Sequence, residues 1–286
     1  MTVRVSPPRI FPRATRAAKP PIDAAGSADA YRQTGFVLDA AVELVLGGLN
    51  LEGAVAEASS GAKYRNHVTA AALGLWSRSW LARLEALHAI EWGNYVAAIS
   101  LVRSATDYAA SELYVLGQDA AEWKEWLDQG GIALAPEQHA MEYRLHAFRA
   151  AEVLAAHEIL GPIYRAAMDL SMPHFGSTLL VAANDSTPER VLMTFGDRDF
   201  HLGLAEIVLG WLLLLSVAEL EAAQAHPEAF AALDAQKLGP FLAAARAAAV
   251  NPEWCRVEPI EIGFEKRFLV QNWRRHPGAA QKRILM

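Results

Sequence analysis

One charged pair lies in a helix-length stretch that is otherwise apolar on nearly every side. The stretch 95–116, YVAAISLVRSATDYAASELYVL, holds only three formal charges, Arg103, Asp107 and Glu112. A helix that is apolar all round is normally the buried centre of a bundle. Arg103 and Asp107 are four residues apart, so they lie on neighbouring turns of one face and can pair. Because an ion pair in a core is costly to desolvate, we expect a role for it beyond stability.

Further polar side chains could converge on this pair to form a ligand site. Tyr164 and His174, with His201 as a third candidate, come from segments that could pack over the middle of the central helix. Together with Asp107, these groups could bind a phosphate or carboxylate, with Arg103 supplying a fork of hydrogen-bond donors. The alternative is a buried polar network that ties the central helix to the SMPHFGS loop. The sequence leaves both interpretations open.

Nine histidines suggest two metal-binding patterns, and projection onto helices weakens both. Glu85 and His88 have the Glu-x-x-His spacing of di-iron bundles, but the chain has no second such motif. A second set falls within roughly a 60° arc of one helix, opposite the apolar side, so it is expected to face solvent. That set is His139, Glu142, His146 and His157. We therefore predict no metal and no cofactor.

Arg83 and His88 form a third pattern, within RLEALH. An arginine followed four to six residues later by a histidine resembles the catalytic pattern of HEPN-type ribonucleases. The resemblance implies that Arg83 would stabilise the charged phosphate and His88 would move a proton at the RNA 2′-hydroxyl. The alternative is an arginine at a helix edge and a histidine with a structural hydrogen bond.

A longer stretch resembles a known family in its layout. The run GNYVAAISLVRSATDYAASELYVLGQDAAEWKEWL, followed downstream by IYRAAMDLSMPHFGS, is similar to uncharacterised bacterial helical families of the DUF5677 type. The resemblance covers roughly residues 93–225. It implies a HEPN-like helical fold and brings no established activity.

Composition narrows the class of protein. The chain has 286 residues, of which 53% are hydrophobic and 20% are charged, as in an ordinary globular protein. The net charge of −6 argues against a broad nucleic-acid-binding surface. The single cysteine, Cys255, excludes an intramolecular disulfide and suits a reducing cytoplasm. The longest apolar stretch, 207–218, is too short to span a bilayer, so it predicts a buried core helix and a soluble cytoplasmic protein without a membrane partner.

These patterns predict an all-α protein, an antiparallel multi-helix bundle with a small β-hairpin inserted near 178–195. Residues 1–27 are expected to be a disordered tail and 28–250 the bundle domain. Residues 251–286 are expected to form an irregular basic extension, with one strand at 258–264.

The favoured functional hypothesis is a bacterial binding or scaffold module that self-associates, for which a homodimer is the simplest form. Its apolar surplus and eight tryptophans leave room for a self-association surface. One alternative is a metal-independent ribonuclease using Arg83 and His88, with RNA as its partner. The other is a sensor that binds a small anionic ligand at Arg103 and its neighbours.

Overall fold

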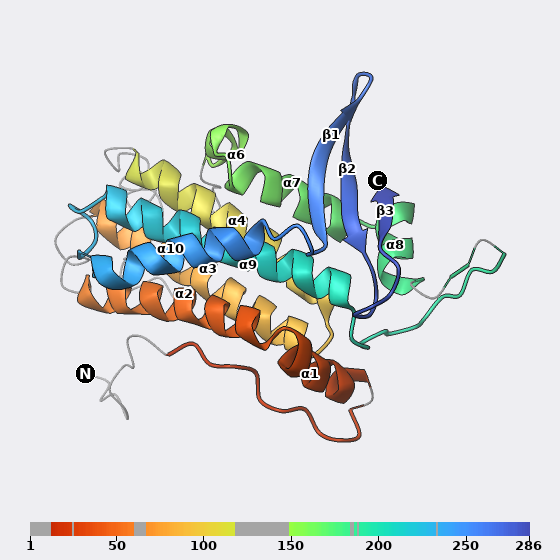
Figure 1. Ribbon diagram of the computed structural model, residues 1–286. Helices are drawn as coiled ribbons and strands as arrows, with labels where there is room; N and C mark the ends of the chain where they lie inside the picture. The colour runs from red at the N-terminus through yellow and green to blue at the C-terminus, as the bar shows by residue number, and fades with distance from the viewer. Residues whose placement is uncertain are drawn as a thin grey trace, which may run out of the picture.

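A computed structural model shows a bundle of long helices with a small sheet beside one end (Figure 1). It describes residues 13–24, 26–59, 67–117, 149–183, 186–187, 189–232 and 234–286. The first helices in this part are α1 (Gly26–Val37), α2 (Asp39–Ala58), α3 (His67–Glu91) and α4 (Tyr95–Leu116). The later helices are α6 (Ala151–Ala156), α7 (Leu160–Ser171), α8 (Phe175–Ala182), α9 (Leu202–Ala225) and α10 (Ala235–Ala249). The strands are β1 (Arg256–Ile262), β2 (Glu265–Trp273) and β3 (Lys282–Leu285).

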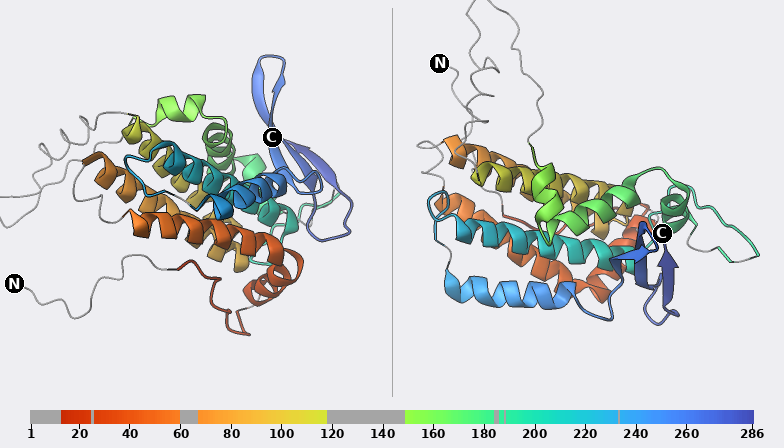
Figure 2. Two further views of the ribbon diagram at one scale, coloured as in Figure 1. Left: turned by 60° about the vertical axis from the view of Figure 1, so that its left-hand side comes forward. Right: turned by 90° about the horizontal axis from the view of Figure 1, so that it is seen from above.

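Helix α9 is the central helix of the bundle. It contacts α2, α3, α4, α7 and α10, and it lies between α10 and the α3–α4 pair (Figure 2). Within the described residues, α9 is long and apolar enough to cross a membrane. However, 94% of its most apolar 18-residue stretch is buried inside the bundle. Helices α1 and α2 are long and apolar enough to cross a membrane only if they are taken together as one span, and the chain bends by 87° between them. The prediction that 207–218 forms a buried core helix is confirmed.

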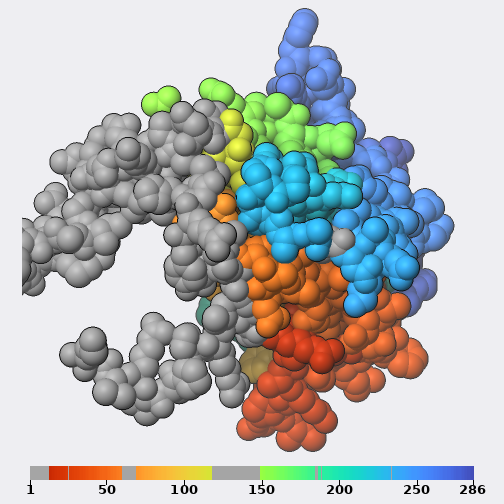
Figure 3. Space-filling view, turned by 90° about the vertical axis from the view of Figure 1, so that its left-hand side faces the viewer, coloured from red at the N-terminus to blue at the C-terminus, as the bar shows by residue number. Residues whose placement is uncertain are grey.

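Helix α10 covers an outer face of the bundle. It packs against both α9 and α2, and seen from the end of the molecule the blue α10 lies against the orange-to-red α2 (Figure 3). Its buried residues, Leu238, Phe241 and Ala245, follow the helical spacing of three and four. This packing closes one side of α9 from solvent.

The α3–α4 hairpin depends on a glycine. Gly93 has a φ of +70°, and a Cβ atom added there would lie 2.0 Å from the carbonyl oxygen of Arg198. Asn94 then caps α4, because its side chain accepts a hydrogen bond from the Ala97 amide at 3.4 Å. A side chain at position 93 would therefore be strained by its backbone and blocked by the loop before α9.

The N-terminal segment is packed on the bundle rather than free. We call residues 13–18 the strap. The Asn50 side chain bonds both the amide and the carbonyl of Ala14, at 3.0 and 3.2 Å. The buried Glu91 carboxylate accepts from the Arg16 Nε at 2.8 Å and from the Ala17 amide at 2.7 Å. Because a buried carboxylate needs partners, this stretch of the expected disordered tail is ordered.

The expected strands near 178–195 are replaced by other structure. Helix α8 occupies the first part of that range, and the described residues after it hold one isolated bridge, between Thr187 and Arg190. A short apolar run such as TLLVA fits a helix or a strand equally well by periodicity. The location predicted for the hairpin is therefore wrong.

The β structure lies instead in the segment expected to be irregular. The strands have the order β1-β2-β3 and are antiparallel, and β1 matches the strand predicted at 258–264. Gly263, with a φ of +64°, takes the first of the two central turn positions between β1 and β2. Glycine at that position is typical of a tight hairpin turn. The hairpin protrudes from the bundle (Figure 1).

Candidate functional site

Four helices each place one charged side chain in the centre of the bundle. The members of this core cluster are Glu52 of α2, Arg83 of α3, Glu112 of α4 and Glu219 of α9, with exposed fractions of 1%, 0%, 1% and 2%. The Arg83 Nη1 and Nη2 donate to the two Glu52 oxygens at 2.7 and 2.5 Å. Glu219 Oε1 lies 3.6 Å from the Arg83 Nη2. Arg83 and Glu52 thus form a bidentate ion pair, and the carboxyl of Glu219 lies beside it.

Neutral groups complete the hydrogen bonding around Arg83 and Glu52. Trp76 Nε1 donates to Glu52 Oε2 at 2.8 Å. Arg83 also donates to the Ser216 Oγ at 3.1 Å and to the Ser79 carbonyl at 3.3 Å. All three guanidinium nitrogens are therefore engaged inside the protein, and none is left for a substrate.

The other two carboxyls of the core cluster, Glu112 and Glu219, are both shifted toward their protonated forms. Burial raises the pKa of Glu112 well above its ordinary value, and the charge of Glu219 and a hydrogen bond with it raise it further. Burial also raises the pKa of Glu219, although the Arg83 charge opposes this. Glu112 Oε2 and Glu219 Oε1 have no hydrogen-bond partner among the described residues. Raised pKa values of this kind favour a neutral carboxyl where three carboxylates would otherwise surround one guanidinium.

The structure corrects the predicted position of Arg103 and Asp107. Both are half-buried on α4, and no ion pair shorter than 4.0 Å joins them within the described part of the chain. The charged residue of α4 that faces the core is Glu112, which follows the buried Val102, Ala105 and Ala109 at helical spacing. The nearly all-apolar composition of this helix concealed which of its faces is buried.

Arg103 nevertheless contacts Tyr164, one of its predicted partners. Its guanidinium lies over the ring of Tyr164 of α7, 5.9 Å from the ring centre. Burial raises the pKa of Asp107, and the nearby Arg103 charge opposes the shift. The Arg103 Nε is buried without a hydrogen-bond partner among the described residues. Arg103, Tyr164 and Asp107 therefore form one neighbourhood.

His174 has a different place from the one predicted. It is exposed at the start of α8, where its Nδ1 accepts from the Ser177 amide at 3.3 Å. Among the described residues, no hydrogen bond or ion pair links it to Arg103 or Tyr164. His174 is a helix cap at the surface.

Arg83 and His88 are not brought together either. Five residues apart on α3, they point roughly 140° apart around the helix axis. Arg83 lies in the core cluster, whereas the His88 Nε2 makes a 2.8 Å hydrogen bond with the carbonyl oxygen of Thr15 in the strap. Its Nδ1 is 3.8 Å from Glu85. This arrangement gives no support to a paired role of Arg83 and His88 on RNA.

His201 is buried at the N-terminus of α9. Its Nδ1 accepts from the Leu204 amide at 3.2 Å, and its own amide donates to the Tyr95 hydroxyl at 2.9 Å. Its ring centre lies 4.5 Å from that of Trp273 in β2. Burial, helped by the Arg275 charge, lowers the pKa of His201 to about 3, so the imidazole is neutral. His201 therefore joins α9, α4 and the sheet.

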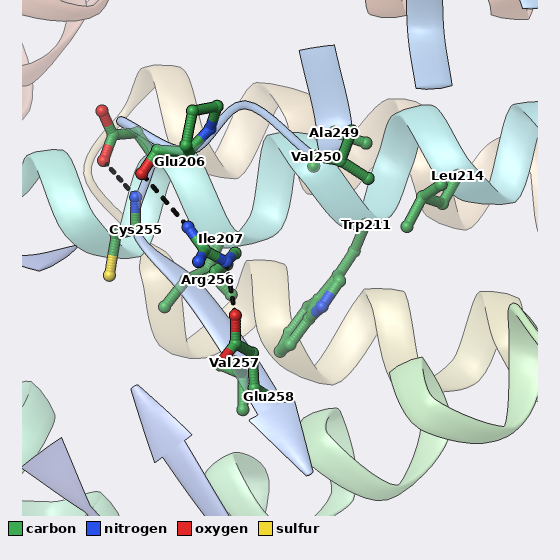
Figure 4. Close-up of a pocket in the computed structure, with 12 residues that line it drawn as sticks. Glu206, Ile207, Trp211, Leu214, Ala249, Val250, Cys255, Arg256, Val257 and Glu258 are labelled. Atoms are coloured by element: carbon green, nitrogen blue, oxygen red, sulfur yellow. Dashed lines mark hydrogen bonds and ion pairs between the residues drawn. The ribbon is translucent and has the colours of Figure 1, made fainter. Parts of the chain in front are cut away.

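An apolar groove runs beside α9, where two adjoining pockets share Trp211, Leu214 and Val257. Their volumes are about 340 and 350 Å³. The Trp211 ring extends from α9 toward β1 (Figure 4). We call this surface the α9 groove; its other apolar lining residues are Ile159, Pro162, Ile163, Ile207, Ala249, Val250 and Pro252. Charged residues line the groove as well, and three of them are paired: Arg256 with Glu258 at 2.6 Å, Arg246 with Glu221 at 2.6 Å and Glu206 with Arg274 at 2.9 Å. The buried Cys255 also lines the first pocket.

A second apolar surface lies on the connection between α8 and α9. We call residues 189–196 the arm; it projects beyond the ends of both helices (Figures 1 and 2). Val191, Met193 and Phe195 are 65%, 57% and 105% exposed. The Thr194 amide donates to the Ala182 carbonyl at 2.8 Å, which ties the returning limb to the end of α8. The arm therefore presents three alternate apolar side chains to solvent.

Comparison with known proteins does not assign the chain to a family. No family model, no curated protein and no solved structure matches it. The predicted resemblance to HEPN-like families stays a prediction.

The predicted metal-binding set can be assessed only in part. Its residues His139, Glu142 and His146 lie outside the described part of the chain. Within that part, no group of three His, Cys, Asp or Glu side chains could hold a metal ion.

Proposed function

We propose that this protein is a binding module that self-associates through its arm. The observation that carries the proposal is the apolar trio of Val191, Met193 and Phe195. Single exposed apolar residues are common on protein surfaces, but a cluster of them on a projecting segment is typical of an interaction site.

The internal chemistry of the protein favours binding over catalysis. The guanidinium N–H groups of Arg83 donate hydrogen bonds to Glu52, Ser216 and Ser79 inside the bundle. The buried histidine, His201, is used as a helix cap. Both polar arrangements hold helices together, which suits a rigid platform that presents a binding surface.

The mass of the protein in solution tests the proposal. Light scattering over a range of protein concentrations should give a mass above that of one chain, and Met193→Asp together with Phe195→Ser should return the mass to 31.1 kDa. Phe264→Ser at the β1–β2 tip, where the side chain is equally exposed, is the matched control and should leave the larger mass unchanged. A single-chain mass at every concentration would refute self-association.

A second candidate function, an anion sensor, is favoured by the unpartnered Arg103 Nε. With the Tyr164 ring on one side, the remaining guanidinium edge could bind a phosphate or a carboxylate. Inorganic phosphate should then raise the melting temperature of the wild-type protein, and Arg103→Met should abolish this rise. Arg78→Met is the matched control, because Arg78 stacks on Tyr108 at 4.1 Å in an exposed position. An equal loss in both variants would exclude a specific Arg103 site.

A further inference from the structure

We propose that the arm of one protomer docks in the α9 groove of a second copy, and that the second copy returns the same contact. This inference rests on the proposed self-association and names its interface. A reciprocal exchange of this kind closes with twofold symmetry and so forms a dimer rather than an open chain.

The dimensions of the arm and the groove agree. An extended chain rises about 3.3 Å per residue, so Val191 and Phe195 are about 13 Å apart. The groove follows α9 from Ile207 to Leu214, about 10 Å at the helical rise, and the second pocket prolongs it to Ile159. The trio of the arm therefore fits the length of the apolar floor.

The charges at the ends of the two surfaces are complementary. Arg190 comes directly before Val191, is exposed, and has no ion pair with any described residue. Glu158 borders the groove next to Ile159, is exposed, and likewise forms no ion pair shorter than 4.0 Å within the described residues. Arg246 lines the same pocket, but it is already paired with Glu221 at 2.6 Å. Docking with Val191 at the Ile159 end places Arg190 beside Glu158. Opposite charges at one rim favour this orientation over the reverse one.

The other end of the docked arm leaves no charge unsatisfied. Phe195 would lie toward the end of the groove where Arg256 and Glu258 already pair with each other. Beyond Phe195, Asp197 is held by Arg275 of its own chain at 3.5 Å. Docking would thus bury apolar surface of the arm without breaking either ion pair.

Engineered cysteines can test this contact in a Cys255→Ala background, because the single native cysteine, Cys255, is buried but lines the α9 groove. A mixture of Met193→Cys and Leu214→Cys proteins should form a disulfide-linked dimer on mild oxidation, and neither variant should do so alone. A mixture of Phe264→Cys and Leu214→Cys is the control and should stay uncrosslinked. Circular dichroism under reducing conditions confirms that each variant is folded. Absence of the dimer from the first mixture, or equal crosslinking in the control, would overturn the proposal.

A charge exchange tests the orientation independently. Arg190→Glu and Glu158→Arg should each weaken dimerisation, and the double variant should restore it, because opposite charges again meet at the rim. A dimer by light scattering that shows neither the crosslink nor the restoration would refute the arm-in-groove contact and leave the proposed self-association standing. A wild-type protein that is a single chain at every concentration would refute both.

Discussion

Arg83 of α3 holds both carboxylate oxygens of Glu52 of α2, at 2.7 and 2.5 Å, in a place where neither side chain is exposed. The pair crosses the centre of the bundle, and Glu219 of α9 stands 3.6 Å away. Breaking a buried pair is costly because it leaves an uncompensated charge, whereas replacing both partners is often tolerated.

Removal of Arg83 alone should therefore destabilise the bundle strongly. We expect Arg83→Met to lower the free energy of unfolding by about 3–5 kcal/mol, because Glu52 would be left buried and unpaired. The double variant Arg83→Met with Glu52→Gln should recover much of that loss. Urea unfolding followed by circular dichroism measures both. If the double variant is no more stable than Arg83→Met, the pair is not the dominant contact of Arg83.

The raised pKa of Glu112 beside Glu219 predicts that the stability of the fold decreases as the pH rises above about 4.5. Since the folded-state pKa of Glu112 is raised above its ordinary value of 4.5, the folded protein binds a proton that the unfolded chain releases. The free energy of unfolding should then fall as the pH rises from about 4.5 through the raised pKa. Glu112→Gln keeps a neutral hydrogen-bonding group and should flatten this slope. Glu85→Gln, on an exposed part of α3, is the control, and an unchanged slope in Glu112→Gln would contradict the assignment.

His201 predicts the opposite dependence at acid pH. Its folded-state pKa of about 3 lies below the ordinary value of 6.5, so the unfolded chain takes up a proton first as the pH falls. Stability should therefore be lost between about pH 6.5 and pH 3. His201→Asn retains a helix-capping side chain and should flatten this acid limb in thermal unfolding curves. His174→Asn, an exposed histidine cap on α8, should leave the curve unchanged. Equal effects of both variants would argue against burial as the cause.

The strap should become more mobile when the side chains that hydrogen-bond to its backbone are replaced. Asn50→Ala deletes two hydrogen bonds to Ala14, each of which contributes about 0.5–1.5 kcal/mol, so the Ala14 amide should exchange its hydrogen faster. Glu91→Gln should do the same for the Ala17 amide. Glu43→Gln serves as the control, because this exposed carboxylate lies 3.9 Å from Arg16. Hydrogen exchange followed by mass spectrometry reads both amides, and unchanged rates would mean that the strap is held by other contacts.

Local spacing in the sequence was sufficient to predict several elements of the fold. The apolar runs predict α4 and the core helix α9. The alternation at 258–264 predicts β1. These features depend on residues within one or two turns of each other, so the pattern of side-chain types carries the information.

The candidate sites required contacts between residues that are distant in the chain. Arg83 meets Glu52 across 31 positions and Ser216 across 133, and Ala17 of the strap meets Glu91 across 74. In a helix with few charges, spacing indicates which charges share a face, but only the neighbouring helices decide whether that face is buried. The sequence by itself determined a helical bundle with charges inside its apolar helices. The tertiary structure decided that Arg83 and Glu112, rather than Arg103 and Asp107, lie at its centre, because burial is a property of the whole packed bundle and not of one helix.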